Sequence, residues 1–242
     1  MNESRQNAAF ATTHWSLVLA AGQRAAPESE RALAALCQAY WGPVYLFVRR
    51  QVAGVHEAQD LTQAFFTQLL EKNLVAVAQP ARGRFRSFLL TSARNFLLNE
   101  WDKQRTQKRG GGQKVLALDF QQHDSKHLLE PADTLTPERL FEREWVLTLL
   151  EQVMARLRAE YARAGKKPIF ERLKGSLSGG DAETSLAEIA RHLEISTNAA
   201  KVAAHRLRKR YRELLRAEIA HTLADPQEID DEIRQLFAAL RP

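Results

Sequence analysis

Residues 84–112 (RFRSFLLTSARNFLLNEWDKQRTQKRGGG) combine large apolar, cationic and small polar side chains in one short stretch. Apolar and aromatic side chains among cations can hold single-stranded nucleic acid, because bases stack on them inside a positive channel. A base can be read fully only once it has left the stack. Helical spacing predicts that the apolar side chains face a core while a second face points outward. The outward residues are then Arg94, Asn95, Asn99 and Arg105.

A second basic stretch begins at Ser185 with SLAEIARHLEISTNAAKVAAHRLRKRYRELLRAEI. Ser185 and Glu188 form a capping-box pattern, and Ser196 can cap a new helix that starts at Thr197. Two short helices around a tight turn predict a helix-turn-helix at about 185–210. The second helix of such a pair enters the major groove of DNA, although a basic helix face can also be merely solvated. Its expected DNA contacts are Asn198, Lys201, His205, Arg206 and Lys209.

The apolar periodicity along the chain predicts helices almost throughout. Three helices are expected in the first half, and Thr136 followed by Pro137 predicts the start of a fourth, which runs toward Ala162. Lys166-Lys167-Pro168 should break that helix, and GSLSGGD (175–181) should form a loop. Asp225 caps a last helix. The first three helices are expected at 28–51, 57–72 and 83–109.

We therefore expect an all-α chain of two small helical domains joined by a flexible linker, the C-terminal one containing the helix-turn-helix. The expected parts are an N-terminal extension (1–27), a first domain (28–109), a linker (110–136), a second domain (137–217) and a C-terminal helical extension (218–242).

The chain has 242 residues, a net charge of +6 and a pI of about 9.6, which favour a polyanionic partner. A single cysteine, Cys37, allows no internal disulfide, and its place in an apolar run indicates a core residue. The apolar run from Trp15 to Ala21 is too short for a membrane span and lacks the features of a signal peptide. We expect a cytoplasmic protein that does not bind a membrane.

Known catalytic patterns do not match the sequence. The seven histidines are scattered, and none forms the helix-spaced pair of a zinc hydrolase. The glycines of RGGGQK (109–114) follow a predicted helix rather than a strand, and no phosphate-binding loop matches. We expect no catalytic residues, no metal site and no cofactor, and hence not an enzyme.

The segments DLTQAFFTQLLEK (60–72), FRSFLLTSARNFLLNEWDKQRTQKR (85–109) and SLAEIARHLEIS…HRLRKRYREL resemble bacterial RNA polymerase sigma factors of the extracytoplasmic-function type. The resemblance covers roughly 33–109 and 140–216. It implies that the first domain is region 2, which binds core RNA polymerase and melts the minus-ten element of promoter DNA. It implies that the second domain is region 4, which reads the minus-thirty-five element.

Carried over by position, the resemblance assigns three groups of residues. Contacts with core polymerase fall on Asp60, Gln63, Phe66 and Leu70. Contacts of region 2 with DNA fall on Arg94, Asn95, Asn99 and Arg105, and those of region 4 on Asn198, Lys201, His205, Arg206 and Lys209.

The chain departs from the family pattern where glutamates are common in the polymerase-binding stretch, since it has Gln59 and Ala64. Phosphorylation of Thr62 or Thr67 by a Ser/Thr kinase would restore negative charge there; the alternative is an unmodified helix threonine. Glu194 replaces the glycine often found in the turn, so that turn could take another geometry. Regulation could instead come from an anti-sigma protein or from the terminal extensions.

Two other functions remain open at this point. One is a stand-alone helix-turn-helix regulator that binds duplex DNA without polymerase. The other is a degenerate sigma homologue that acts as an interaction protein. The segment 60–109 discriminates a sigma factor from the stand-alone regulator, because a simple regulator needs no melting helix.

Overall fold

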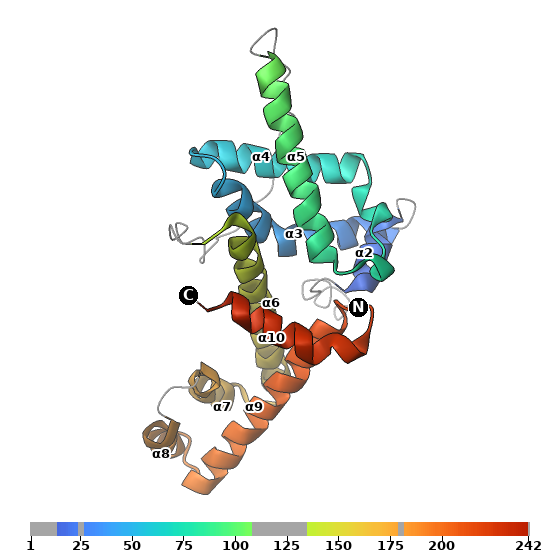
Figure 1. Cartoon of the computed structure of the whole chain (residues 1–242). Coiled ribbons are helices and arrows are strands. Elements are labelled where there is room, and N and C mark those ends of the chain that lie inside the picture. Colours follow the sequence, from blue (N-terminus) through green and yellow to red (C-terminus); the bar gives the residue numbers. More distant parts are fainter. Residues whose placement is uncertain (1–13, 24–26, 108–134, 179–181, 242) are drawn as a thin grey trace. The chain divides into compact units, whose positions relative to one another are not determined.

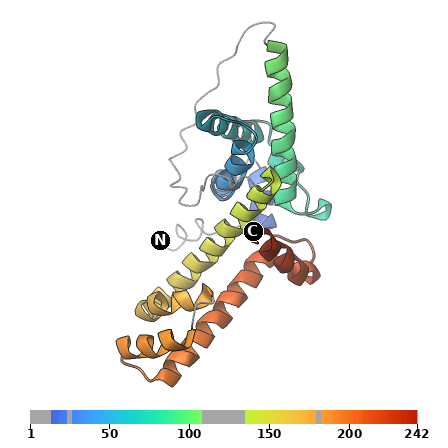
Figure 2. The same cartoon turned by 60° about the vertical axis from the view of Figure 1, so that its left-hand side comes forward.

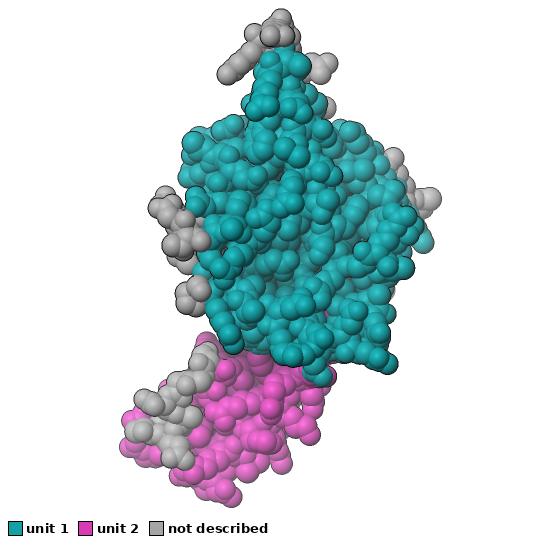
Figure 3. Space-filling view, in the orientation of Figure 1, with its two compact units in different colours: residues 1–148, 220–242 teal, residues 149–219 magenta. Residues whose placement is uncertain are grey.

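The computed structural model describes residues 14–23, 27–107, 135–178 and 182–241. Every regular element in these ranges is helical, which confirms the predicted all-α fold. The chain divides into two compact units (Figure 3): unit 1 comprises residues 1–148 and 220–242, and unit 2 comprises residues 149–219. The expected linker falls outside the described residues except for its last two positions. Among the helices described, none has both the length and the apolarity to cross a membrane.

Unit 1 contains helices from both ends of the chain (Figure 1). Three helices follow the predicted periodicity closely, since α3 (Pro27–Arg49), α4 (Val55–Glu71) and α5 (Phe85–Gln107) begin and end within two residues of their expected limits. The elements are α2 (Trp15–Gly22), α3 (Pro27–Arg49), α4 (Val55–Glu71), η2 (Leu74–Val77), η3 (Pro80–Arg82), α5 (Phe85–Gln107), the first part of α6 (Pro137–Arg163), η5 (Pro226–Glu228) and α10 (Ile229–Ala239).

Aromatic contacts among α3, α4, α5 and α6 form the core of unit 1. The ring of Phe65 on α4 meets Phe96 on α5 edge to face at 5.7 Å. Tyr40 on α3 contacts Phe85 on α5 at 5.6 Å and Phe141 on α6 at 6.3 Å. Burial of such side chains stabilises the fold by about 1.5–3 kcal/mol each, so these contacts fix the base of α5. The C-terminal part of α5 extends beyond α3 and α4 (Figures 1 and 2).

The apolar run near the N-terminus forms a helix, α2, at a place where the sequence analysis predicts no element. Trp15 packs edge to face on Phe85, with ring centroids 6.2 Å apart. Its backbone N–H donates to the carbonyl of His221 at 3.1 Å. A Cβ on Gly22 would lie 3.0 Å from the Cα of Ala76, so α2 and η2 can pack this closely only with glycine there. Residues 14–23 of the expected N-terminal extension and residues 220–241 of the C-terminal one therefore belong to unit 1.

Unit 2 is built around the contact between the second part of α6 and α9. Leu149 and Leu157 on α6 and Leu207 and Leu214 on α9 are fully buried. The remaining elements are α7 (Lys167–Leu173), η4 (Lys174–Ser178), α8 (Ala182–His192) and α9 (Thr197–Ala220). The predicted break at 166–168 is real, but Pro168 lies in the first turn of α7, where its missing N–H costs nothing.

Four residues connect α8 to α9. Ile195 N–H donates to the carbonyl of Ala190 at 3.0 Å and Glu194 N–H to that of Arg191 at 3.3 Å, which is the Schellman pattern. Glu194 occupies its left-handed position with φ 54°, so the turn keeps the geometry that glycine usually supplies. Ser196 Oγ accepts from the N–H of Ala199 at 3.1 Å, which confirms its capping role. The expected capping box is wrong, because α8 already begins at Ala182 and Ser185 lies within it.

Charge pairs join α6 to α9 within unit 2. Arg210 donates to both oxygens of Glu160, at 2.8 Å from Nε and 2.9 Å from Nη2. Arg156 donates to the buried Glu218 at 2.6 Å. The bond from Arg210 holds the pKa of Glu160 below its usual range, and partial burial opposes that effect. This bidentate pair should therefore respond to acid.

We expect Glu160→Gln to lower Tm at pH 7 by a few degrees, which corresponds to roughly 1 kcal/mol for a partly exposed pair. Because the folded-state pKa lies below the unfolded one, the stabilisation is present above pH of about 4.3 and is lost as pH falls through the folded value. Thermal unfolding between pH 7 and pH 3 should show the two proteins converging. Glu213→Gln, which removes only an exposed contact, is the control, and a Tm gap that persists at pH 3 would contradict the assignment.

Candidate nucleic-acid interface

The outer face of α5 carries the predicted region 2 residues. Arg94, Asn95 and Asn99 are exposed, and Arg105 is 84% exposed. The opposite face holds the buried Leu89, Phe96 and Leu97, as the sequence predicts. A single helix thus separates core-forming from solvent-facing groups, and the latter include amides that can donate and accept hydrogen bonds.

Leu98 belongs to this outer face and was missed in the sequence. Its side chain is 50% exposed, although leucine is usually buried. It lies three residues from Asn95 and four from Arg94, so it shares their side of the helix. The spacing alone could have identified it. An apolar group beside amides and a cation is suited to contact the face of an unstacked base.

Acidic side chains partly neutralise this face. Arg94 forms an ion pair with Glu138, near the start of α6. Lys103 donates to Glu100 at 2.6 Å, and Arg105 lies 4.0 Å from Asp102. These pairs are exposed and therefore weak, so a phosphate could replace the carboxylate.

The predicted polymerase-binding residues on α4 divide into two groups. Asp60 is exposed, and Gln63 and Leu70 are half-buried. Phe66 is 1% exposed and stacks on Trp41 with ring centroids 5.6 Å apart, so it belongs to the core and not to a binding surface. The resemblance assigned Phe66 by its position in the motif alone, and the packing of α4 against α3 buries its side chain.

Neither threonine considered for phosphorylation presents its hydroxyl to solvent. Thr62 is fully buried, and its Oγ1 donates to the carbonyl of Ala58 at 2.7 Å. The Oγ1 of Thr67 is also buried, without a hydrogen-bond partner in the part of the chain that the structure describes. A kinase could reach either group only if this face of α4 opened first.

The predicted residues on α9 form one exposed stripe. Asn198, Lys201, His205 and Lys209 follow one another at spacings of three and four, and Arg206 lies beside them. Lys201 and Lys209 make no ion pair with any residue that the structure describes. Val202, 42% exposed, lies within the stripe and was missed in the sequence. On the other side of the helix, the buried Ala200 and Ala204 face the interior of unit 2.

Two other arginines of α9 serve the fold. Arg210 is held by Glu160, and Arg208 Nε donates to the carbonyl of Ser176 at 3.2 Å. The structure therefore separates the cations of this helix into an exposed group and a group bound within unit 2. Sequence position alone does not distinguish them.

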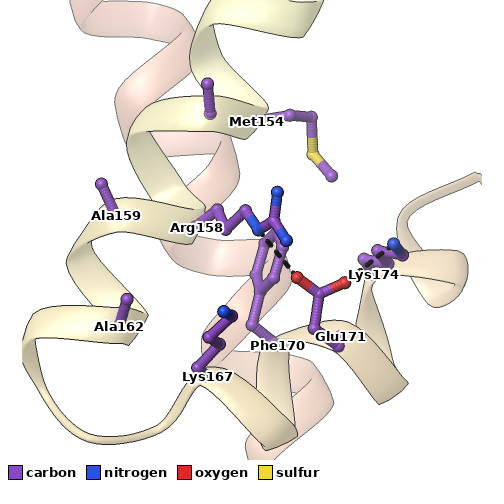
Figure 4. Close-up of a pocket in the computed structure, with 9 residues that line it drawn as sticks. Met154, Arg158, Ala159, Ala162, Lys167, Phe170, Glu171 and Lys174 are labelled. Atoms are coloured by element: carbon purple, nitrogen blue, oxygen red, sulfur yellow. Dashed lines mark hydrogen bonds and ion pairs between the residues drawn. The ribbon is translucent and has the colours of Figure 1, made fainter.

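A groove of about 540 Å³ lies between α6 and α7 in unit 2 (Figure 4). Phe170 lines it, and Glu171 bridges Arg158 at 2.7 Å and Lys174 at 2.8 Å. The bond from Lys174 holds the pKa of Glu171 below its usual range. No predicted site residue lines this groove. Three of its four charged side chains, Arg158, Glu171 and Lys174, bind one another, and Glu171 is its single acid.

Cys37 does not offer a nucleophile. Its side chain is buried, and burial raises the pKa of the thiol to about 11. The thiolate, which is the reactive form, is therefore rare at neutral pH. This agrees with the core position expected from the sequence.

Residues 36–107 match the family model of sigma-70 region 2. The match includes all of α4 and α5. Neither the curated proteins nor the solved structures gave a match to this chain.

Glu138→Gln should increase DNA binding, because it removes the carboxylate that holds Arg94. Since exposed pairs contribute at most about 1 kcal/mol, we expect a two- to fivefold gain in affinity at low salt. Binding to a forked promoter fragment, measured in the complex with polymerase, tests this. Glu30→Gln has the same charge change on α3 and should have no comparable effect. An equal gain in both variants would show that net charge alone is responsible.

Lys201→Ala should weaken binding to duplex DNA roughly fivefold and reduce the dependence on salt by about one counterion. The reason is the loss of a cation on the exposed stripe of α9. Affinity in the polymerase complex at several salt concentrations measures both effects. Arg172→Ala, which removes an exposed cation from α7, is the control. Wild-type affinity and salt dependence in Lys201→Ala would exclude this stripe as the contact.

Proposed function

We propose that the chain is a sigma factor of the extracytoplasmic-function type that directs promoter-specific transcription initiation. The observation that carries the proposal is the two-sided character of α5, a helix of the segment that matches region 2. Its buried face packs against the rest of unit 1. Its outer face presents Arg94, Asn95 and Asn99 together. Those groups suit a separated DNA strand, because their hydrogen bonds can read bases that have left the stack.

Unit 2 supports the second half of the proposal, recognition of the minus-thirty-five element. A capped helix follows a short turn, and its exposed stripe of Asn198, Lys201 and His205 has the dimensions of a recognition helix. Short alanine side chains between these residues leave few groups that read bases. Phosphate contacts and DNA shape would then contribute much of the specificity.

Docking on core RNA polymerase is proposed for the exposed part of α4. Asp60 is an exposed acid of this surface, and Gln63 and Leu70 follow it along α4. With Phe66 in the core, this surface is smaller than the sequence suggested. A Ser/Thr kinase or an anti-sigma protein is retained as a proposed regulator, although the burial of Thr62 disfavours modification of the closed helix.

Under this proposal, the protein is a cytoplasmic subunit of RNA polymerase that has no enzymatic activity of its own. The segment that matches region 2 favours it over a stand-alone helix-turn-helix regulator, which has no use for a melting helix. A degenerate homologue that keeps only a binding role would share the fold. Transcription therefore discriminates it from an active sigma factor.

Core RNA polymerase from the source organism should produce specific transcripts from genomic promoters only when this chain is added. Asn95→Ala with Asn99→Ala should lower open-complex formation at least tenfold, because the amides that read the melted strand are lost. Co-purification with core polymerase should remain at the wild-type level. Asn198→Ala, which alters the other unit, should shift promoter preference rather than abolish melting.

If the wild-type chain binds core polymerase but yields no transcript, the degenerate homologue is supported. If it binds DNA but not polymerase, the stand-alone regulator is supported. Either result would overturn the proposed function.

A further inference from the structure

Helix α5 begins with an unfavourable arrangement of charge. The carbonyl of Arg84 accepts the first helical bonds, from the N–H groups of Ser87 at 3.1 Å and Phe88 at 3.2 Å. Arg86 lies in the first turn, and that turn contains no acidic residue. The N-terminus of a helix carries a partial positive charge, so cations there are repelled and anions are favoured. The start of α5 therefore requires a negative charge from elsewhere in the chain.

Glu232 of α10 supplies this charge. Its carboxylate is fully buried and forms ion pairs with both Arg84 and Arg86, the latter at 2.5 Å from Nη2 to Oε1. One turn further along α10, Gln235 accepts a hydrogen bond from Arg84 Nη1 at 2.8 Å. Figure 2 shows α10 beside the base of α5. Glu228, just before the helix, is exposed and makes none of these contacts.

Arg86 is enclosed on its remaining sides. It is only 3% exposed, its Nε donates to Glu142 of α6 at 3.1 Å, and its guanidinium lies 4.7 Å from the centroid of the Trp145 ring. A buried guanidinium without sufficient counter-charge is strongly destabilising. Arg86 of α5 thus connects α6 and α10, and of its two carboxylate partners Glu232 is the one that is fully buried.

We propose that Glu232 is a positioning residue for the DNA-facing helix, so that the C-terminal helix α10 is a functional part of the region 2 unit. Its carboxylate balances the positive charge of Arg84 and Arg86 at the start of α5. It thereby fixes the direction in which the helix presents Arg94, Asn95 and Asn99. The docking of α10 stands on the contacts above. The consequence for DNA rests on the proposed function.

The first experiment uses the full-length free chain and hydrogen exchange. Glu232→Gln should raise the exchange rate of amides in 229–239 and in the first turns of α5 by on the order of 100-fold, because the two arginines lose their shared counter-charge. Amides of α9 at 200–214 should exchange as in the wild type. Glu228→Gln makes the same chemical change at an exposed position and should leave all of these rates unchanged. Wild-type exchange in Glu232→Gln would overturn the proposal.

The second experiment measures function in the complex with core polymerase. Glu232→Gln should reduce the rate of open-complex formation about tenfold while the affinity for core polymerase stays within twofold of wild type. Glu232→Asp keeps the negative charge and should recover part of the rate. A variant with altered exchange but a wild-type rate would overturn the positioning role. The positioning role would also be overturned if the affinity for core polymerase and the rate of open-complex formation fell together.

Arg84→Gln provides a milder change, since Arg84 is partly exposed and Glu232 retains Arg86. Like Glu232→Gln, it should raise the exchange rate and lower the rate of open-complex formation, but by smaller factors. It replaces Glu232→Gln in both experiments if that variant does not fold. Unchanged exchange and rate in a folded Arg84→Gln would count against the proposal. If the wild-type chain itself forms no open complex, the proposed function fails and the DNA role of Glu232 fails with it. The exchange experiment still decides whether Glu232 docks α10.

Discussion

The burial of one face of α5 is the constraint on which the rest of unit 1 depends. Phe85 and Phe96 pack against aromatic side chains of α3 and α4, and Leu97 is buried as well. A helix so anchored cannot rotate about its axis without exposing these side chains. The rotation of α5 about its own axis, fixed by these buried side chains, therefore determines which of its other side chains face solvent. Arg94, Asn95, Leu98 and Asn99 form a single surface because the opposite residues are fixed in the core.

The distribution of acids then decides which cations remain available. Buried or bidentate carboxylates hold the arginines that connect helices, as Glu232 does for Arg86 and Glu160 does for Arg210. Cations of the exposed stripes have weak carboxylate partners, as Arg94 does, or none within the described residues, as is true of Lys201. A net positive charge is thus divided between a part that stabilises helix contacts and a part that can neutralise phosphate. Composition alone gives the total and not this division.

Local patterns in the sequence were sufficient for the long helices α3, α4, α5 and α6 and for the outward face of α5, because these depend on spacings of three and four residues. The cap at Ser196 was predictable for the same reason. Phe66 was misplaced because its burial depends on Trp41, which is distant along the chain. Ser185 was misplaced because α8 extends one turn further than its capping pattern suggests. The contacts of α2 and α10 with α5 join residues far apart in sequence, so no local pattern could indicate them.

The separation in sequence between Arg86 and Glu232 also has a consequence for synthesis. A ribosome adds about 5–20 residues per second, so the acid emerges on the order of ten seconds after the arginine it neutralises. During that interval, the start of α5 lacks its internal counter-charge although the whole of the segment matching region 2 has been made. A nascent or prematurely terminated chain would carry the DNA-facing residues on an incompletely fixed helix. Helix α10 thus links the fixing of the outer face of α5 to the synthesis of residues 229–239.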